Sequence, residues 1–238
     1  MDDIVKTYII SKKQFDEEYE YEKAVGSVSD YRRQKIDKLK NAEDKKRSLA
    51  ASIALNAALK EYGLEECMME YELGKQGKPY FRNHPEIHFS LSHSGNYAIC
   101  SIGPCEVGND IERVRIGREK VAQRFFAKEE LDWIYGTEVP RAKDLQEAFN
   151  DCDDKIFRIW TMKESFLKVT GLGMSLPLNE FAIMVAENGC IHIRQDINDK
   201  TYHIKEYIMT DVLNEGEDYK ISVCSETPVF AVQLIQVL

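Results

Sequence analysis

The chain has 238 residues, enough for one sizeable domain or two small ones. Its residues are 43% hydrophobic and 31% charged, which is typical of folded globular proteins and excludes disordered or fibrous classes. The net charge of −9 excludes a chain-wide basic field for nucleic acid or an anionic membrane surface, so any site for anions has to be local.

The N-terminus and the cysteines favour a cytoplasmic protein. The first residues are acidic and lack a secretory signal pattern, and no run approaches the ~20 apolar residues that span a bilayer. The six cysteines form no C-x-x-C pair and no Cys/His cluster, so neither a zinc site nor a redox motif is indicated. We therefore expect no nucleic-acid partner and no membrane partner.

A long core helix is predicted over residues 41–62. Asn41 is placed to cap it, acidic residues fill its first turn, and Gly63 ends it. Residues 29–40, just before it, are polar and basic and predict a short helix or a turn. The basic group that runs from this stretch into the helix comprises Arg32, Arg33, Lys35, Lys38 and Arg47. Arginine suits forked hydrogen bonding to phosphate, although a solvated face would have the same composition.

The middle of the chain predicts short strands. A turn-rich stretch at 74–79 leads to β-like runs at 88–91 and 97–102, with a hydroxyl-rich turn, residues 92–96, between them. The histidine and serines of that turn can bind phosphate, but no G-x-S-x-G elbow indicates that Ser92 is a nucleophile. Gly103 and Pro104 then mark a junction, which predicts two halves, residues 1–104 and 105–238.

A β-like run at 107–114 contains the sequence G-N-D-I-E. Asp110 and Glu112 are two residues apart, so they project from the same face of a strand. A divalent cation would relieve their repulsion, and Mg²⁺ typically uses one or two carboxylates together with waters and substrate phosphates. Taken alone, the pair is more often just the polar face of an amphipathic strand.

The next elements are two short helices around residues 117–135, an acidic loop over 136–154, and a helix over 156–170. The last helix carries an apolar stripe of Ile159, Met162, Phe166 and Val169. Its opposite side carries Trp160, Lys163, Glu164 and Lys168. By itself, the Glu164 and Lys168 pair would be a surface contact of only ~0.2–0.5 kcal/mol.

The remainder alternates between apolar and polar residues in several runs, which predicts an antiparallel meander up to the C-terminus. Helices followed by short antiparallel strands give an α+β fold class.

The order of the motifs is more specific than any one of them. The sequence contains G-K-P at 77–79, F-S-L-S-H-S-G at 89–95, G-N-D-I-E at 108–112, F-F-x-x-x-E at 125–130 and W-T-M-K-E-S-F-L-K at 160–168. This order resembles the Sfp-type 4′-phosphopantetheinyl transferase family of the holo-acyl-carrier-protein synthase superfamily. The resemblance implies a pseudo-dimer of two similar α+β halves with coenzyme A bound between them, and the junction near Pro104 fits that arrangement.

The resemblance also implies roles for individual residues. The carboxylates that would hold Mg²⁺ on the pyrophosphate of coenzyme A are Asp110, Glu112 and Glu164. The residues that would act in catalysis are Glu164, Lys168 and Asp110. The residues that would contact the phosphates are Lys163, Lys168, His93, Arg32, Lys35, Arg47 and Ser48. Lys78 and Pro79 would pack near the adenine, with Ser92 close by.

The implied reaction is attack by a serine hydroxyl of an acyl or peptidyl carrier protein on the β-phosphate, with release of 3′,5′-ADP. Either Glu164 or a water molecule on the metal would accept the serine proton. The five basic residues within 113–124, from Arg113 to Arg124, would dock an acidic helix of the carrier protein, and a monomer is expected. The alternatives are another metal-dependent phosphohydrolase or nucleotidyl transferase, and a non-enzymatic module that binds coenzyme A or a nucleotide.

The chain departs from the family pattern at three places. Asn109 replaces an aliphatic residue, so a polar group needs a partner there if it is buried. Ala127 replaces a serine or threonine that would cap a helix. The acidic insert at 144–154 has no counterpart in the family pattern.

Overall fold

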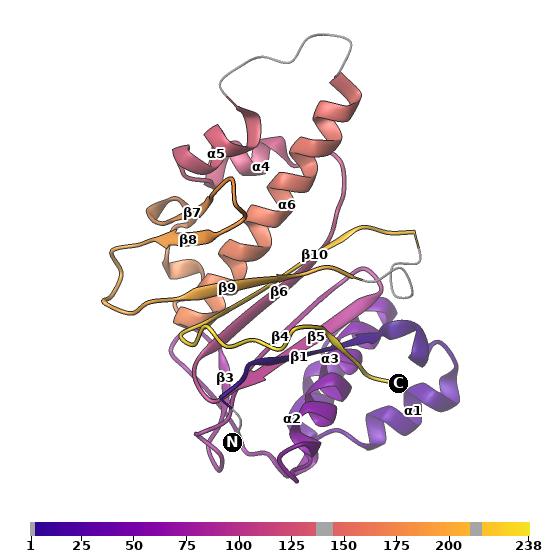
Figure 1. Cartoon of the computed structure of the whole chain (residues 1–238). Coiled ribbons are helices and arrows are strands. Elements are labelled where there is room, and N and C mark those ends of the chain that lie inside the picture. The colour runs from indigo at the N-terminus through magenta and orange to yellow at the C-terminus, as the bar shows by residue number, and fades with distance from the viewer. Residues whose placement is uncertain (1–2, 137–144, 210–215) are drawn as a thin grey trace.

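The computed structural model describes residues 3–136, 145–209 and 216–238 (Figure 1). Two β-sheets form its centre, and each carries one long helix, which confirms the α+β fold class. Within the described residues, none of the helices combines the length and the apolar character that crossing a membrane requires.

The first sheet has the strand order β11-β1-β5-β4. Its strands are β1 (Lys6–Ser11), β4 (His88–Ser94), β5 (Tyr97–Gly103) and β11 (Ile235–Gln236). Helix α3 (Ala42–Lys60) packs on this sheet, and Asn41 caps it by accepting a hydrogen bond from the backbone N–H of Glu43, as the sequence predicts. Strand β5 is buried over its whole length because alternate residues face α3 and the space between the two sheets.

The second sheet has the order β6-β10-β9, and both of its strand pairs are antiparallel. Its strands are β6 (Val107–Arg113), β9 (His203–Tyr207) and β10 (Tyr219–Ser225). Helix α6 (Leu145–Thr170) packs against β6 and β10. Buried residues from both sheets, such as Ile9, Ile99 and Ile221, form a core between them.

Smaller elements surround the sheets. The remaining α-helices are α1 (Glu18–Gly26), α2 (Asp30–Asp37), α4 (Glu119–Phe125) and α5 (Lys128–Tyr135). Two hairpins are formed by β2 (Tyr71–Leu73) with β3 (Pro79–Phe81) and by β7 (Ala182–Val185) with β8 (Ile191–Arg194). The 3₁₀ turns are η1 (Lys12–Phe15), η2 (Glu66–Met68), η3 (Gly173–Ser175) and η4 (Leu178–Glu180).

Strands β4 and β6 lie side by side where the two sheets meet (Figure 1). Each is the last strand of its own sheet, and no backbone ladder joins them within the described residues. The serines that the sequence places in a turn belong to β4, which continues to Ser94, so the turn is shorter than expected. This edge-to-edge junction brings α6 close to the loops of the first sheet.

Helix α6 corrects the prediction of a loop over 136–154. Residues 145–154 are already helical, whereas 137–144 lie outside the described residues. Asp153, within the acidic insert, is buried, and its carboxylate accepts hydrogen bonds from the backbone N–H groups of Gly117 and Arg118. The end of the insert is therefore hydrogen-bonded to the segment between β6 and α4.

The C-terminal segment corrects the prediction of one antiparallel meander. Strands β7 and β8 form a separate hairpin, and β11 pairs in parallel with β1 of the first sheet. The last residues thus cross to the first sheet, where Val237 donates its backbone N–H to the carbonyl of Ile9 at 2.9 Å. Hydrophobic alternation does not reveal the partner strand, so the sequence pattern cannot assign β11 to the first sheet.

Candidate active site

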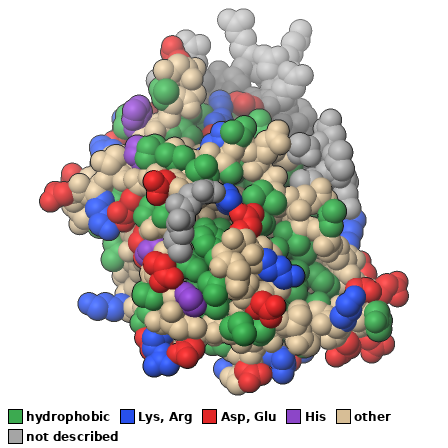
Figure 2. All heavy atoms as spheres, turned by 60° about the horizontal axis from the view of Figure 1, so that its bottom comes forward, with side chains coloured by type: hydrophobic (Ala, Val, Ile, Leu, Met, Phe, Trp, Pro, Cys, Tyr) green, Lys and Arg blue, Asp and Glu red, His purple; other side chains and the backbone are tan. Residues whose placement is uncertain are grey.

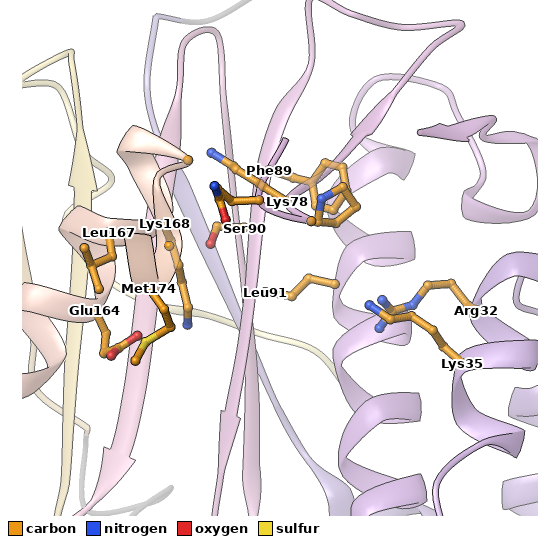
Figure 3. A pocket seen from close by; sticks show the side chains of 15 residues that line it. Arg32, Lys35, Lys78, Phe89, Ser90, Leu91, Glu164, Leu167, Lys168 and Met174 are labelled. Atoms are coloured by element: carbon orange, nitrogen blue, oxygen red, sulfur yellow. The ribbon is translucent and has the colours of Figure 1, made fainter. Parts of the chain in front are cut away.

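A cavity of about 320 Å³ lies between α6 on one side and α2, the β2–β3 hairpin and β4 on the other (Figure 3). Arg32 and Lys35 approach it from α2, and Glu164 and Lys168 from α6. An adjoining hollow shares Arg32, Lys35, Leu91 and Lys168 with this cavity and is also lined by Ser48, Ser92 and His93. Most of the cofactor contacts predicted from the sequence therefore surround one continuous depression.

Arg32 and Lys35 provide the positive wall of the cavity. Arg32 is 5% exposed, and its guanidinium donates to Ser52 Oγ at 2.8 Å and to the carbonyl of Ser48 at 3.3 Å. Lys35 is exposed, but its ammonium group is partly desolvated, and this desolvation and the charge of Arg32 lower its pKa. Neither side chain forms a salt bridge within the described ranges. On the face drawn in Figure 2, by contrast, basic side chains are scattered among acidic ones. These two unneutralised cations suit an anionic ligand.

Arg47 and His93 lie at the adjoining hollow. Arg47 pairs with Asp44 and donates to the carbonyl of Gly95 at 3.4 Å, and it is not among the residues that line either depression. Its charge nevertheless reaches His93, whose pKa is lowered by desolvation and by the charges of Arg47 and Lys168. His93 itself is exposed on strand β4, so the imidazole is accessible to a ligand.

Lys78 and Pro79 form another wall of the cavity at the start of β3. The ammonium group of Lys78 donates to Glu106 Oε2 at 2.5 Å and to the carbonyl of Val107 at 3.0 Å. Lys78 thus ties the β2–β3 loop to the beginning of β6, and its charge is already neutralised.

The three predicted carboxylates come from two facing elements. Asp110 and Glu112 lie on β6, and Glu164 lies on α6, which packs on that strand. Asp110 Oδ1 accepts hydrogen bonds from Ser92 Oγ at 2.7 Å and from Lys168 Nζ at 2.8 Å. Burial and the charges of Asp110 and Glu112 raise the pKa of Glu164, whereas Lys168 opposes the shift. Burial and the charge of Asp110 likewise raise the pKa of Glu112. The three groups therefore sense one another electrostatically.

The carboxylates suit a divalent cation whose coordination is completed by a ligand. Within the described part of the chain, no three His, Cys, Asp or Glu side chains form a ready group for a metal ion. Asp110 Oδ2, however, is buried without a hydrogen-bond partner, which is costly unless a cation or a donor occupies that position. Mg²⁺ commonly takes one or two protein carboxylates and completes its shell with water and substrate phosphate, and these residues fit that pattern.

Lys163 is placed differently from the prediction. Its side chain is fully buried and its ammonium contacts Glu130 Oε1 at 2.7 Å and the carbonyls of Leu178 and Phe181 at 2.7 and 2.8 Å. Burial lowers its pKa to about 8 against the charge of Glu130. The expected contact with phosphate is therefore wrong, because Lys163 points into the core under α5 rather than toward the cavity.

Several residues of the site were missed in the sequence. Phe89, Leu91, Leu167 and Met174 form apolar walls, but isolated apolar residues are not distinguishable from core residues by pattern. The motif G-N-D-I-E contains Gly108 but gives no reason for a glycine at that position. A Cβ at Gly108 would lie 2.0 Å from the carbonyl oxygen of Ser165 and 2.4 Å from the backbone N of Val169. This glycine therefore lets α6 approach β6 closely enough for Lys168 to reach Asp110.

Comparisons with known proteins point to one family. The model of the 4′-phosphopantetheinyl transferase superfamily matches residues 106–224, and a model of the N-terminal part of 4′-phosphopantetheinyl transferases matches residues 16–104. A 4′-phosphopantetheinyl transferase of Bacillus subtilis is 32% identical over 213 residues, which cover 89% of this chain and 88% of the relative. The 4′-phosphopantetheinyl transferase Sfp of Bacillus subtilis strain 168 is 31% identical over 212 residues, with coverage of 89% and 88%.

Solved structures give a weaker likeness. A holo-[acyl-carrier-protein] synthase of Thermotoga maritima matches with a TM-score of 0.36 and 18% identity, over 50% of this chain and 61% of that protein. The sequence relatives, in contrast, cover most of both chains. On the strength of these relatives and of the superfamily match, the chain belongs to the 4′-phosphopantetheinyl transferase superfamily.

Proposed function

We propose that this chain carries out the reaction of its family in the cavity beside α6, by moving the 4′-phosphopantetheine arm of coenzyme A onto a serine of a carrier protein. Family membership supports the reaction class. The observation that carries the location is that Arg32 and Lys35, which form no salt bridge within the described residues, face Glu164 and Lys168 across one cavity (Figure 3). The pyrophosphate of coenzyme A needs cations for binding, and transfer of the phosphopantetheine needs a base near the attacking serine hydroxyl.

The basic wall would bind the phosphates of coenzyme A. Arg32 is held in place by Ser52 and Ser48 and so presents its guanidinium without further ordering cost. Lys35 and His93 would supply further contacts, with Arg47 adding positive charge at the adjoining hollow. The adenine would pack against Pro79 and Phe89, which line the same cavity. Direct contacts of Lys78 and Ser48 stay predictions.

In the reaction, the serine hydroxyl of the carrier forms a bond to the β-phosphorus, and the bond from that phosphorus to the bridging oxygen breaks. The bridging oxygen leaves with 3′,5′-ADP, and the hydroxyl proton passes to a base. Glu164 is our candidate, because its carboxylate lines the cavity opposite Arg32 and Lys35 and makes no hydrogen bond or salt bridge within the described residues. The ammonium of Lys168, anchored by Asp110 and the carbonyl of Asn109, would stabilise negative charge on the phosphates.

Asp110, Glu112 and Glu164 would hold Mg²⁺. When bound, the ion would neutralise charge on the pyrophosphate and so favour departure of the leaving group. The buried Asp110 Oδ2 without a partner supports this role.

We further propose that the two predicted halves, residues 1–104 and 105–238, form a pseudo-dimer with the cavity between them. One sheet with one long helix in each half supports the division, and the two family models meet at residues 104–106. The C-terminal strand β11 would then act as a strap, since it pairs with β1 of the first half. A monomeric state and a cytoplasmic location stay predictions.

The carrier protein would dock on residues 113–124. Arg115, Arg118, Lys120 and Arg124 are exposed there, and Ile116 is 82% exposed. A small hollow beside them is lined by Glu112, Arg118, Val121 and Trp160, so it connects this surface with the predicted carboxylates. Exposed cations around an apolar centre would suit an acidic amphipathic helix.

The test is incubation with coenzyme A, Mg²⁺ and an apo carrier protein, followed by intact-mass measurement. A phosphopantetheine adduct on the carrier and equimolar 3′,5′-ADP are expected. Release of phosphate or adenylate without the carrier would favour a hydrolase or a nucleotidyl transferase. Binding of coenzyme A with no adduct on a panel of acyl and peptidyl carriers would reduce the chain to a binding module.

A further inference from the structure

The alternate serines of β4 face the edge of β6 and bridge the junction of the two sheets. Ser90 Oγ accepts from the backbone N–H of Asn109 at 3.1 Å, and Ser94 Oγ accepts from that of Arg113 at 3.1 Å. The hydroxyls thus occupy the place that backbone partners would take in a continuous sheet. Ser90, Ser92 and Ser94 are all at most 9% exposed, so each hydroxyl needs a protein partner.

Two of these three serines, Ser92 and Ser94, also donate hydrogen bonds to the two carboxylates of β6. Ser92 Oγ donates to Asp110 Oδ1 at 2.7 Å, and Ser94 Oγ donates to Glu112 Oε2 at 2.7 Å. A hydroxyl has one proton, so neither serine can donate to a phosphate while it makes this contact. Ser92 also lines the adjoining hollow, so its predicted contact with the cofactor stays a prediction.

We infer that Ser94 is a positioning residue, which fixes Glu112 for the metal ion and connects that carboxylate to the first sheet. Ser94 binds both the side chain of Glu112 and the backbone of the residue that follows it, so it fixes the end of β6 as well as the carboxylate. Within the described ranges, Glu112 forms no salt bridge and accepts no other side-chain hydrogen bond, although Arg115 and Arg118 act on it at longer range. Without Ser94 the carboxylate would be free to turn.

The inference rests on the proposed function only in taking Glu112 as a metal ligand. Groups that orient the ligands of a metal typically affect its affinity about 10- to 100-fold. A serine that only joined the sheets would affect the stability of the fold and leave the affinity of the folded protein unchanged.

The test measures Mn²⁺ binding to the full chain in the presence of coenzyme A, from the free-ion electron paramagnetic resonance signal. Ser94→Ala is expected to raise the dissociation constant about 10-fold, and Ser94→Thr, which keeps the hydroxyl, is expected to restore it. The Mg²⁺ concentration for half-maximal transfer should rise by the same factor, with kcat at saturating Mg²⁺ close to that of the wild type. Ser225→Ala is the control, because Ser225 is a buried strand serine that donates to the carbonyl of Glu106.

An Mn²⁺ affinity of folded Ser94→Ala within twofold of the wild type would overturn the inference. If Ser94→Ala does not fold, Ser94→Cys gives the same comparison, because its thiol is a weak donor of similar size, and an unchanged affinity again counts against Ser94. The binding measurement needs no carrier protein. Loss of Mn²⁺ affinity in a chain that modifies no carrier would therefore support the role of Ser94 and reject the proposed function.

Discussion

Helix α6 carries Lys163 on one face and Lys168 on another, and the two ammonium groups meet different surroundings. Lys163 is fully buried against Glu130 and two carbonyl groups, so its charge is neutralised inside the second core. Lys168 is 30% exposed at the cavity and contacts Asp110, which has a buried oxygen without a partner. One motif therefore supplies one cation that is buried in the core and one that lines the cavity, and the packing of the helix decides which is which.

The largest effect is expected at the cavity face, from Glu164→Ala. Loss of the proposed base should lower the rate of transfer by about 10²–10⁴-fold, with the fold intact, because Glu164 makes no hydrogen bond or salt bridge within the described residues. Initial rates of carrier modification by intact mass give the comparison, and thermal unfolding checks the fold. Glu129→Ala, on the exposed surface of α5, is the matched control. A rate within threefold of the wild type would remove Glu164 from the mechanism.

At the buried face, Lys163→Met should act on stability. Removing one partner of a buried pair typically costs ~3–5 kcal/mol, because Glu130 is left charged and fully buried. Urea unfolding gives the free energy, and transfer per folded molecule should stay close to that of the wild type. Adding Glu130→Gln should recover part of the loss. If transfer fell 100-fold while the unfolding curve did not move, Lys163 would belong to the active site after all.

Gly108→Ala tests whether the close packing of α6 on β6 is required. A Cβ there would lie 2.0 Å from the carbonyl oxygen of Ser165, so α6 has to move away from β6. Such overpacking typically costs ~1–3 kcal/mol, and transfer should fall as well, because Lys168 and Glu164 move with the helix. Gly26→Ala is the control, since a Cβ at Gly26 meets no atom within 4 Å. Unchanged stability and activity would mean that the backbone adjusts freely.

Helical periodicity explains why the sequence predicts the same surroundings for Lys163 and Lys168, although Lys163 is buried and Lys168 lies at the cavity. The core helix at α3, the two helices before α6 and the α+β class follow from local caps and apolar spacing, and all are present. Lys163 and Lys168 both lie away from the apolar stripe of α6, so the pattern favoured exposure for both. The partner that buries Lys163, Glu130, lies on α5, and spacing within one helix contains no information about another.

Long-range pairing limited the prediction in the same way elsewhere. The sequence predicts a turn for Ser92 and Ser94, although serines alternate with other residues there as they would on one face of a strand. Their partners on β6 lie in a different sheet, and local spacing does not reveal them. The prediction for Asn109 is confirmed for half of its amide group. Its Nδ2 donates to the carbonyl of Ser90 and to Ser101 Oγ, both at 3.0 Å, whereas its Oδ1 is buried without a hydrogen-bond partner within the described residues.

Lys78 resembles Lys163 because its charge is paired with a glutamate, and it resembles Lys168 because it lines the cavity. The smallest effect is expected from Glu106→Gln, which removes the charge of that glutamate. Burial would raise the pKa of Glu106, but the hydrogen bond with His88 and the charge of Lys78 lower it to about 2. A lowered pKa stabilises the fold above the unfolded value near 4.5, and that contribution is lost as the pH falls toward the folded value. Because the Glu106 side chain is 41% exposed, the gap between wild type and variant at neutral pH should stay below ~1 kcal/mol.

Urea unfolding of both proteins from neutral pH down to about pH 3 measures this gap. It should be constant above about pH 5 and narrow below it, since the unfolded chain then takes up the proton that the folded chain resists. A gap that widens toward acid would mean that Glu106 is protonated more readily in the fold than in the unfolded chain. The charge of Lys78 at the cavity would then be less fully balanced by Glu106.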